Sequence, residues 1–253
     1  MIQEEKITSR ANPLLRHIRK LASSGAYRRK NGEFLCDGRK LLHEALQWNA
    51  AVTAVVAVEG EEIPVIEGAR RVRVPEDVMR SIAPSETPQG VLLVCRMAEQ
   101  TLPVRLEGSH YIVLDGVQDP GNLGTILRTA DAFDCDGLFL VGDCADLYNP
   151  KTVRATMGAL FRRPVWRCEA AALHALLKAS HLPLYGAALR QDTIDARSVD
   201  YSRAAVAIGS EGRGLSDAML ALCDCTVRLP MSQRCESLNA AVAASVFLWE
   251  MYR

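Results

Sequence analysis

The stretch from Tyr111 to Phe133 is an apolar strand that passes through a tight turn directly into a helix. The turn is Asp119-Pro120-Gly121-Asn122, and the helix carries Arg128. Open α/β sheets bind ligands at such strand ends, because backbone N–H groups and the positive end of the helix dipole point outward there. This segment therefore predicts both the class of sheet and the edge at which it holds a ligand.

The helix after this turn has two different faces. Asn122 is placed to cap its first turn with the side-chain oxygen. Gly124 and Arg128 lie one turn apart on the predicted outward face. A glycine within a helix costs about 1 kcal/mol relative to alanine, so close approach of a ligand is one interpretation, and a plain helix start with a solvated arginine is the other. The stripe predicted to be buried consists of Leu123, Ile126, Leu127 and Ala130.

Strands and helical patterns alternate regularly from residue 107 to residue 253. Such a βαβ series implies an α/β domain with a mainly parallel sheet and helices on both faces. Residues 1–97 form a smaller α/β pattern, and residues 98–106 break the pattern as a linker does. We therefore predict an N-terminal domain over 1–97 and a C-terminal domain over 107–253.

The boundaries of individual elements follow from the same patterns. In the first domain we expect strands at 34–36, 52–58, 72–74 and 91–95, and helices from Asn12-Pro13 to Gly25, over 40–48 and over 76–82. In the second we expect strands near 112, at 138–141, near 165, and at 183–189, 204–208 and 226–229, with a final helix over 238–252. That helix is apolar almost all round, so it is covered on two sides, either within one subunit or by a second copy.

The composition restricts the class of protein. A chain of 253 residues with 49% hydrophobic content can bury a substantial core. No apolar run reaches membrane-spanning length and the N-terminus lacks a secretory segment, so we expect a cytoplasmic protein. The eight scattered cysteines indicate reduced, buried thiols; Cys223 and Cys225 are the one close pair, and we expect no metal because further ligands are missing nearby.

Positive charge is concentrated near the N-terminus although the formal net charge is zero. Ten lysines and arginines lie between Lys6 and Lys40, against the acidic residues Glu33 and Asp37. A local basic patch on a neutral protein is typical of phosphate binding, whereas a merely solvated helix face is the alternative. The residues that we expect to contact phosphates are Arg28, Arg29, Lys30 and Arg39.

Two further strand ends carry glycines or small polar residues where a backbone would meet a ligand. The strand 204–208 runs into Gly209-Ser210-Glu211-Gly212-Arg213-Gly214. The strand 226–229 runs into Pro230-Met231 and then into Ser237-Leu238-Asn239 at the start of the final helix. Each alone is a weak signal: the first segment matches neither a P-loop nor the dinucleotide fingerprint, and Ser237 and Asn239 could be plain helix caps.

In order and spacing, the three segments together resemble the SpoU (TrmH-like) family of RNA 2′-O-ribose methyltransferases in the SPOUT superfamily. Asn122-x-Gly124-x-x-x-Arg128 is similar to the first family motif and Gly209-x-Glu211-x-x-Gly214 to the second. Leu229-Pro230-Met231 with Ser237-Leu238-Asn239 is similar to the third, and residues 149–159 extend the likeness. The N-terminal part, with Phe34–Gly38 and Thr87–Gly90, is more loosely similar to a small RNA-binding domain related to a ribosomal-protein fold.

The resemblance implies S-adenosylmethionine as methyl donor, a trefoil knot in the C-terminal domain and an active site completed across a homodimer. By position in the motifs, donor contacts are implied for Gly209, Leu229, Met231 and Leu238. Catalytic or supporting roles are implied for Asn122, Arg128, Glu211, Ser237 and Asn239. The implied partner is RNA, bound in part by Arg28, Arg29, Lys30 and Arg39.

Three positions depart from the family pattern. Gln233 stands where a glycine is usual, which bears on the shape of the donor loop, and Ala240-Ala241 stands where Val-Ser is usual. The extra N-terminal domain favours ribosomal RNA over tRNA as substrate. A non-catalytic RNA-binding or ribosome-assembly protein of this fold is the alternative, and a dinucleotide enzyme is disfavoured because an early Gly-x-Gly-x-x-Gly is absent.

Overall fold

The computed structural model describes residues 4–190, 192–232, 234 and 237–253. By its internal contacts the chain divides into two units. Unit 1 comprises residues 1–99 and 146–161, and unit 2 comprises residues 100–145 and 162–253. Residues 146–161 thus pack with the N-terminal unit, although they fall inside the range that the sequence assigns to the C-terminal domain. The chain leaves unit 2 after Ala145 and re-enters it at Arg162.

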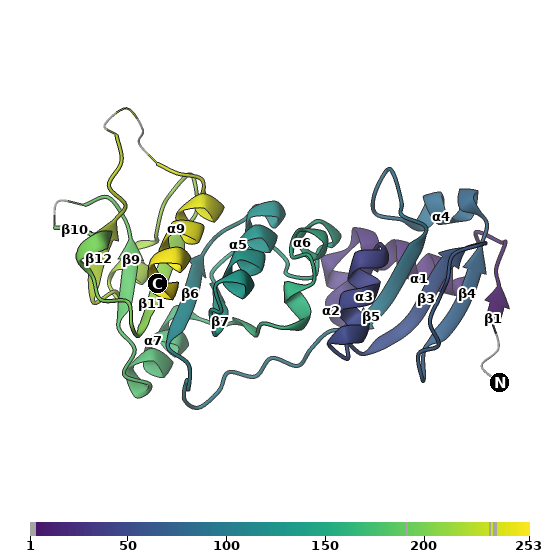
Figure 1. The fold of residues 1–253 in the computed structure, drawn as a ribbon, viewed down its shortest axis with the longest axis horizontal. Coiled ribbons are helices and arrows are strands. Elements are labelled where there is room, and N and C mark those ends of the chain that lie inside the picture. The colour runs from purple at the N-terminus through teal and green to yellow at the C-terminus, as the bar shows by residue number, and fades with distance from the viewer. Residues whose placement is uncertain (1–3, 191, 233, 235–236) are drawn as a thin grey trace. The chain divides into compact units, whose positions relative to one another are not determined.

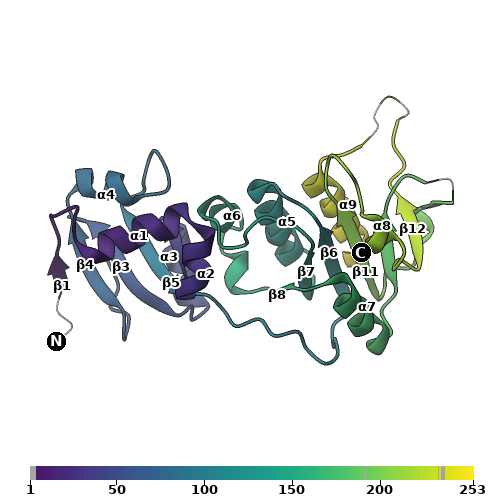
Figure 2. The same cartoon turned by 180° about the vertical axis from the view of Figure 1, so that it is seen from behind.

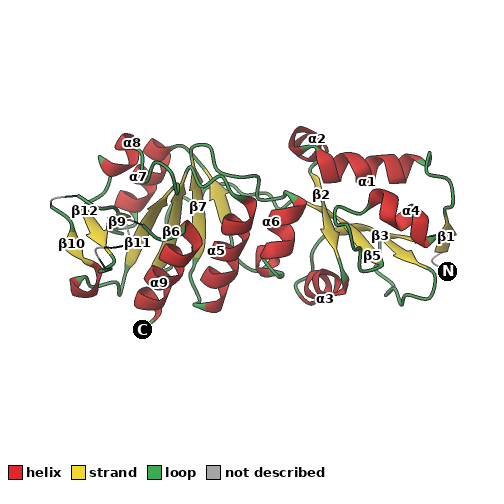
Figure 3. Ribbon diagram, turned by 90° about the horizontal axis from the view of Figure 1, so that it is seen from above, coloured by secondary structure: helices red, strands yellow, loops and turns green. Residues whose placement is uncertain are grey.

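Unit 1 is built on a five-stranded mixed sheet in the order β1-β4-β3-β5-β2. Helices α1 and α4 cover one face and α3 covers the other (Figures 2 and 3). The pairs β1–β4 and β3–β4 are parallel, whereas β3–β5 and β2–β5 are antiparallel. Its elements are β1 (Glu4–Lys6), α1 (Pro13–Ser23), α2 (Gly25–Asn31), β2 (Glu33–Asp37), α3 (Arg39–Gln47), β3 (Val52–Val58), β4 (Arg70–Val74), α4 (Glu76–Ile82), β5 (Val91–Arg96), α6 (Pro150–Ala155) and the 3-10 turn η1 (Ala159–Phe161).

The first helix begins as predicted and ends differently. Asn12 caps α1, its side chain accepting from the Leu14 N–H at 2.9 Å, and Pro13 occupies the first turn. The expected stop at Gly25 is wrong, because α1 ends at Ser23 and Gly25 opens α2. Ser24 caps that second helix by accepting from the Tyr27 N–H at 3.2 Å. The basic run Arg28–Lys30 therefore lies on a helix, on which successive residues point in different directions.

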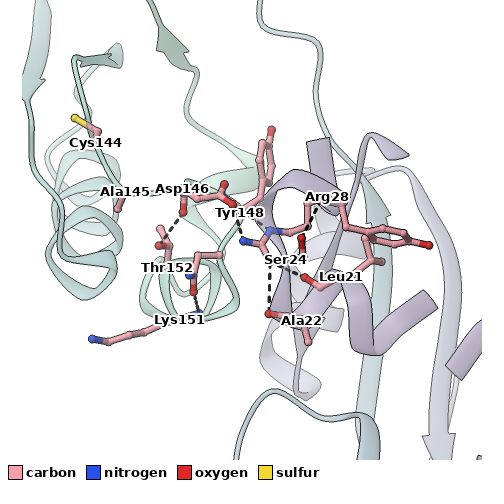
Figure 4. Close-up of polar contacts among 12 residues, drawn as sticks. Leu21, Ala22, Ser24, Arg28, Cys144, Ala145, Asp146, Tyr148, Lys151 and Thr152 are labelled. Atoms are coloured by element: carbon pink, nitrogen blue, oxygen red, sulfur yellow. Dashed lines mark hydrogen bonds and ion pairs between the residues drawn. The ribbon is translucent and has the colours of Figure 1, made fainter. Parts of the chain in front are cut away.

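Arg28 is buried in unit 1 and is 3% exposed (Figure 4). Its guanidinium bonds Asp146 Oδ2 through Nη2 at 2.6 Å and through Nε at 3.1 Å. Nη1 donates to the Leu21 carbonyl at 2.6 Å, at the end of α1. A buried cation requires such partners, since an unpaired charge away from water is strongly unfavourable. Arg28 thus joins α1, α2 and the segment 146–161.

The segment 146–161 contributes apolar side chains to the core of unit 1. Tyr148 and Phe161 pack against Phe34, with ring centroids 4.7 and 6.4 Å apart, and Val153 is 1% exposed in the same cluster. Gly158 lies against the buried side chain of Glu44 with a backbone φ of +99°, a conformation and a space that only glycine accommodates. This segment is therefore an integral part of unit 1.

Unit 2 is built on a seven-stranded sheet in the order β10-β12-β9-β11-β6-β7-β8, and each pairing between its described strands is parallel. Helices α5 and α9 lie side by side on one face, and α7 lies on the other (Figures 1 and 3). Its elements are β6 (His110–Asp115), α5 (Pro120–Ala132), β7 (Gly137–Val141), β8 (Val165–Arg167), α7 (Ala170–Ala179), β9 (Leu184–Ala187), β10 (Ile194–Asp195), the 3-10 turn η2 (Ala196–Ser198), β11 (Ala204–Gly209), α8 (Asp217–Leu220), β12 (Cys225–Arg228) and α9 (Ala240–Tyr252).

The predicted fold class is confirmed: the C-terminal sheet is parallel and helices cover both of its faces. The short edge strands β1 and β10 are not predicted from the sequence, because two or three residues give too little pattern to detect. Within the described residues, no helix combines the length and apolar character needed to cross a bilayer.

Replacing Arg28 with alanine should destabilise unit 1. The change leaves Asp146 and the Leu21 carbonyl without their partner, and breaking a largely buried pair costs about 3 kcal/mol. Arg29→Ala removes the same charge from an exposed position and should change the free energy of unfolding by less than about 0.5 kcal/mol. Denaturant unfolding of both variants measures the difference, and equal effects would show that the Arg28 contacts do not stabilise the unit.

Candidate active site

The carboxyl ends of four neighbouring parallel strands, β12, β9, β11 and β6, meet at one edge of unit 2. In this register Gly209 at the end of β11 lies beside Asp115 at the end of β6. The segments after β6 and β11, and the longer segment from β12 to α9, all start from this edge. The sheet order thus gathers the three sequence motifs, which lie far apart along the chain.

The segment after β11 is a tight turn held by its own backbone. Ser210 N–H donates to the Gly214 carbonyl at 3.1 Å, and Gly214 N–H donates to the Ser210 carbonyl at 2.8 Å. A Cβ at Gly209 would overlap the Gly214 backbone, and Gly214 itself has a φ of +67°. Both positions therefore require glycine. Asp115, only 7% exposed, accepts from the Ser216 N–H at 2.7 Å and fixes the far side of the turn.

Three predicted catalytic residues form one hydrogen-bonded cluster. The side-chain amide of Asn122 donates to Glu211 Oε1, across 89 residues of sequence. Asn239 Nδ2 lies 3.1 Å from the same carboxylate oxygen and 3.2 Å from Asn122 Oδ1. The cluster connects the start of α5, the turn after β11 and the start of α9.

The caps of the two helices explain how these side chains are oriented. The prediction that Asn122 caps α5 is wrong: Asp119 is the cap, and its carboxylate accepts from the Asn122 N–H at 2.8 Å. The Asn122 side chain is therefore available for Glu211. Asn239 does cap α9, its side-chain oxygen accepting from the N–H groups of Ala241 at 2.9 Å and Val242 at 3.3 Å. Its amide nitrogen is left to face the cluster.

A cavity of about 390 Å³ opens beside this cluster. Its lining combines the turn after β11, the ends of β9 and β12, and the start of α9, and all four predicted donor contacts, Gly209, Leu229, Met231 and Leu238, belong to it. Glu211 and Ser237 line it as well. Glu211 is thus shared between the cavity and the polar cluster.

Arg128 lies apart from this group. It is exposed on α5 and is not part of the cavity lining, and its guanidinium makes no hydrogen bond or ion pair within the described part of the chain. The prediction that Gly124 shares its outward face is wrong, because Gly124 is buried. α9 packs along α5, so α5 is covered over a wider arc than a single stripe predicts.

The cations predicted to bind phosphates lie in different environments within unit 1. Arg29 and Lys30 are exposed, and Arg39 is exposed but 2.5 Å from the carboxylate of Glu61. The interpretation of Arg28 needs correction, because its guanidinium is buried against Asp146 and cannot meet a phosphate without breaking that pair. Sequence alone does not distinguish Arg28 from Arg29, since the distinction depends on a carboxylate 118 residues away.

Some residues next to the site are not predicted from the sequence, and one predicted position lies outside the described residues. Arg190, Arg213 and Arg228 line the cavity although no motif singled them out. Asp115 is recognisable in the sequence as an acidic residue at the end of an otherwise apolar strand, a place typical of site residues. Gln233 falls outside the described residues, whereas Ala240 and Ala241 lie buried in the first turn of α9.

The cysteines near the site are free thiols. Cys223 and Cys225 are both unpaired by disulfide. Burial raises the pKa of the Cys223 thiol to about 12, so it stays protonated at neutral pH and is a poor nucleophile. The described residues hold no cluster of three or more side chains suited to a metal ion.

Family comparisons match both parts of the chain. The model described as SpoU rRNA Methylase family matches residues 109–249, which contain the cluster and the cavity lining. The model described as MRM3-like substrate binding domain matches residues 12–93, within unit 1.

Two relatives align with nearly the whole length of this chain. The chain is 32% identical to the 23S rRNA (guanosine(2553)-2'-O)-methyltransferase of Bacillus subtilis, over 98% of this chain and 99% of that protein. It is 33% identical to the 23S rRNA (uridine(2479)-2'-O)-methyltransferase of Streptomyces viridochromogenes, over 98% of this chain and 92% of that protein.

Solved structures agree with the sequence comparisons. The AdoMet-bound rRNA methyltransferase from Sinorhizobium meliloti superposes with a TM-score of 0.87 at 31% identity, covering 98% of this chain and 97% of that one. With a family model that matches more than half of the chain and relatives that align along its whole length, the predicted family is confirmed. The chain belongs to the SpoU rRNA methylase family.

Proposed function

We propose that this protein transfers a methyl group from S-adenosylmethionine to a ribose 2′-hydroxyl of ribosomal RNA. The observation that carries the proposal is the position of Glu211, which lines the cavity and also accepts hydrogen bonds from Asn122 and Asn239. A donor cavity and a polar cluster that share one side chain suit a transfer between two bound molecules. The names of the two 23S rRNA methyltransferase relatives support RNA ribose as the acceptor. With this substrate, we propose a cytoplasmic location for the protein.

The cavity fits a donor of this size and chemistry. Its volume of about 390 Å³ lies within the range of small-molecule pockets. Gly209, Leu229, Met231 and Leu238 would hold the donor, with backbone groups at the glycine turn and apolar side chains elsewhere. When bound, S-adenosylmethionine supplies a sulfonium methyl group that is open to direct displacement. The family implies that these loops belong to its trefoil knot.

The chain contributes mainly by alignment. Direct displacement requires the ribose oxygen to lie behind the methyl group, and fixing two reactants in such a geometry lowers a barrier by roughly 7–11 kcal/mol. The backbone-closed turn at Gly209–Gly214 and the cluster around Glu211 provide fixed walls for this alignment. Ser237 lines the same cavity from the start of α9.

Arg128 supplies the cation that this mechanism needs. A guanidinium keeps its proton in proteins, so Arg128 acts as an electrostatic partner of the developing alkoxide or of the adjacent phosphate and does not act as a base. Because Arg128 lies outside the cavity lining of its own chain, we assign it to the active site of a second copy. This assignment of Arg128 requires a homodimer.

The exposed face of α9 is suited to such a partner. Val242, Val246 and Trp249 are 49%, 37% and 52% exposed and recur at helical spacing on one side of the helix. A row of exposed apolar side chains typically marks an interaction surface. It lies on the helix that Asn239 caps, so a partner bound there would be close to the site.

Unit 1 supplies part of the RNA contact in this proposal. Arg29 and Lys30 are exposed on α2, and Arg39 begins α3. The match of residues 12–93 to a substrate-binding domain supports this role. Arg28 does not take part in this RNA contact, because its guanidinium is paired with Asp146 and stabilises unit 1.

The direct test is mapping of ribose methylation by mass spectrometry in ribosomal RNA from cells with and without this protein. We expect one 2′-O-methyl group to be absent without the protein and restored by it. Unchanged methylation of ribosomal RNA, together with loss of a methyl group from tRNA, would show that the substrate is tRNA and contradict the proposal of ribosomal RNA.

Gly209→Ala should abolish donor binding, because the added Cβ overlaps the backbone of Gly214 and opens the turn. Gly212→Ala is the matched control, since a Cβ there meets nothing within 4 Å and its φ is not in the left-handed region. Calorimetric titration with S-adenosylmethionine should detect binding to the control and none to the Gly209 variant. Equal affinities would remove Gly209 from the donor site.

Arg128→Lys keeps the charge and loses the planar guanidinium, so we expect turnover to fall by about 10²–10³-fold while donor binding is unchanged. Mixing this variant with the Gly209→Ala variant should restore activity, because each mixed dimer regains one intact site. Random pairing of equal amounts gives about a quarter of wild-type activity. Near-full turnover of Arg128→Lys would disprove the guanidinium role, and a mixture without activity would disprove the shared site.

A further inference from the structure

Three arginines surround the mouth of the cavity, each at a different strand end. Arg228 is the last residue of β12, Arg190 follows β9 by three residues, and Arg213 lies in the turn after β11. The strands β12, β9 and β11 are immediate neighbours in the sheet. All three arginines belong to the cavity lining, so the sheet order brings them to one opening.

These cations are at most weakly paired within the described part of the chain. Arg213 and Arg228 are exposed, and their guanidinium groups make no hydrogen bond or ion pair there. Arg190, with 52% of its side chain exposed, has a long 3.8 Å pair with Asp192. Asp195, the strand partner of Arg228, is bonded by Arg197 at 2.7 and 3.0 Å. These bonds, and to a smaller extent the nearby charge of Arg228, lower the pKa of the Asp195 carboxyl to about 2.

The cavity lining itself leaves an excess of positive charge. Its one carboxylate is Glu211, whose Oε1 already accepts from the amides of Asn122 and Asn239. The lining therefore holds three guanidinium groups and one carboxylate, and that carboxylate is already hydrogen-bonded to the two asparagine amides. An opening lined in this way attracts an anion.

Arg213 is held on a rigid support. The turn that carries it is closed by two backbone hydrogen bonds between Ser210 and Gly214. Glu211 lies in the same turn and is fixed to the polar cluster. The backbone of Arg213 is thus held in place two residues from Glu211, so little backbone freedom is lost when its side chain binds.

We propose that Arg190, Arg213 and Arg228 bind backbone phosphates of the RNA strand next to the ribose that is methylated. Guanidinium groups bind phosphate oxygens through paired, charge-assisted hydrogen bonds. The three residues are positioning residues: they hold the acceptor strand over the cavity and take no part in the bond changes. This inference rests on the proposed function and adds an RNA contact in unit 2 to the one proposed for unit 1.

The test compares two double variants of the full-length protein. Arg213→Ala/Arg228→Ala removes two charges at the cavity mouth. Arg105→Ala/Lys178→Ala removes two exposed charges in segments that lead into β6 and β9, at the amino edge of the same sheet. Binding of ribosomal RNA purified from cells without this protein is measured over a range of salt concentrations, and donor binding is measured by calorimetry.

We expect the cavity variant to bind RNA at least about tenfold more weakly, since each lost charged hydrogen bond weakens binding by roughly that factor. The slope of log affinity against log salt should become shallower by about 1.4, or 0.7 per phosphate released. Donor affinity should be unchanged, and KM for RNA should rise with kcat little altered. The control variant should retain the wild-type slope, and Arg213→Lys/Arg228→Lys should restore it.

An unchanged salt slope in the cavity variant would overturn the proposal. Loss of donor affinity with unchanged RNA affinity would also overturn it, because the arginines would then bind the donor carboxylate. If the salt slopes of the wild type and the cavity variant differ as expected but the wild type transfers no methyl group, the proposed function is contradicted and the RNA contact of these arginines still stands.

Discussion

The parallel order β12-β9-β11-β6 is the constraint on which the site depends, because it places four carboxyl ends at one edge. Segments separated by 89 and 117 residues of sequence meet there through the side chains of Asn122, Glu211 and Asn239. The turn at Gly209–Gly214 can lie between them only because two glycines permit its backbone. The cavity and the polar cluster therefore both border this turn, and Glu211 belongs to both.

Local patterns were sufficient to predict the elements that form the site. The strands 110–115 and 204–209 have apolar interiors, as expected of strands covered on both faces. Asn239 caps α9, as an asparagine before an apolar helix should. The glycine-containing motif after β11 identified the turn. Sequence order alone could not show that β9 lies between β11 and β12, so the contribution of Arg190 to the cavity was not foreseen.

Two of the errors share one physical cause, which is competition between neighbouring residues that have the same chemistry. Asp119 and Asn122 are both good caps, and the earlier one takes the role because Pro120 suits the first turn that follows it. Arg28 and Arg29 are equivalent by composition, but one turns toward Asp146 and the other toward water. Such choices are decided by partners distant in sequence, which no local pattern contains.

Burial of Arg28 also changes how the basic N-terminal segment is understood. A charge count treats every lysine and arginine as available to a phosphate, yet the charge of Arg28 is balanced by Asp146 and that of Arg39 is paired with Glu61. The cations at the cavity mouth in unit 2 are paired more weakly, although their part of the sequence shows no basic run. For a chain with zero net charge, the pairing of each cation therefore indicates its capacity to bind RNA better than the local density of charge does.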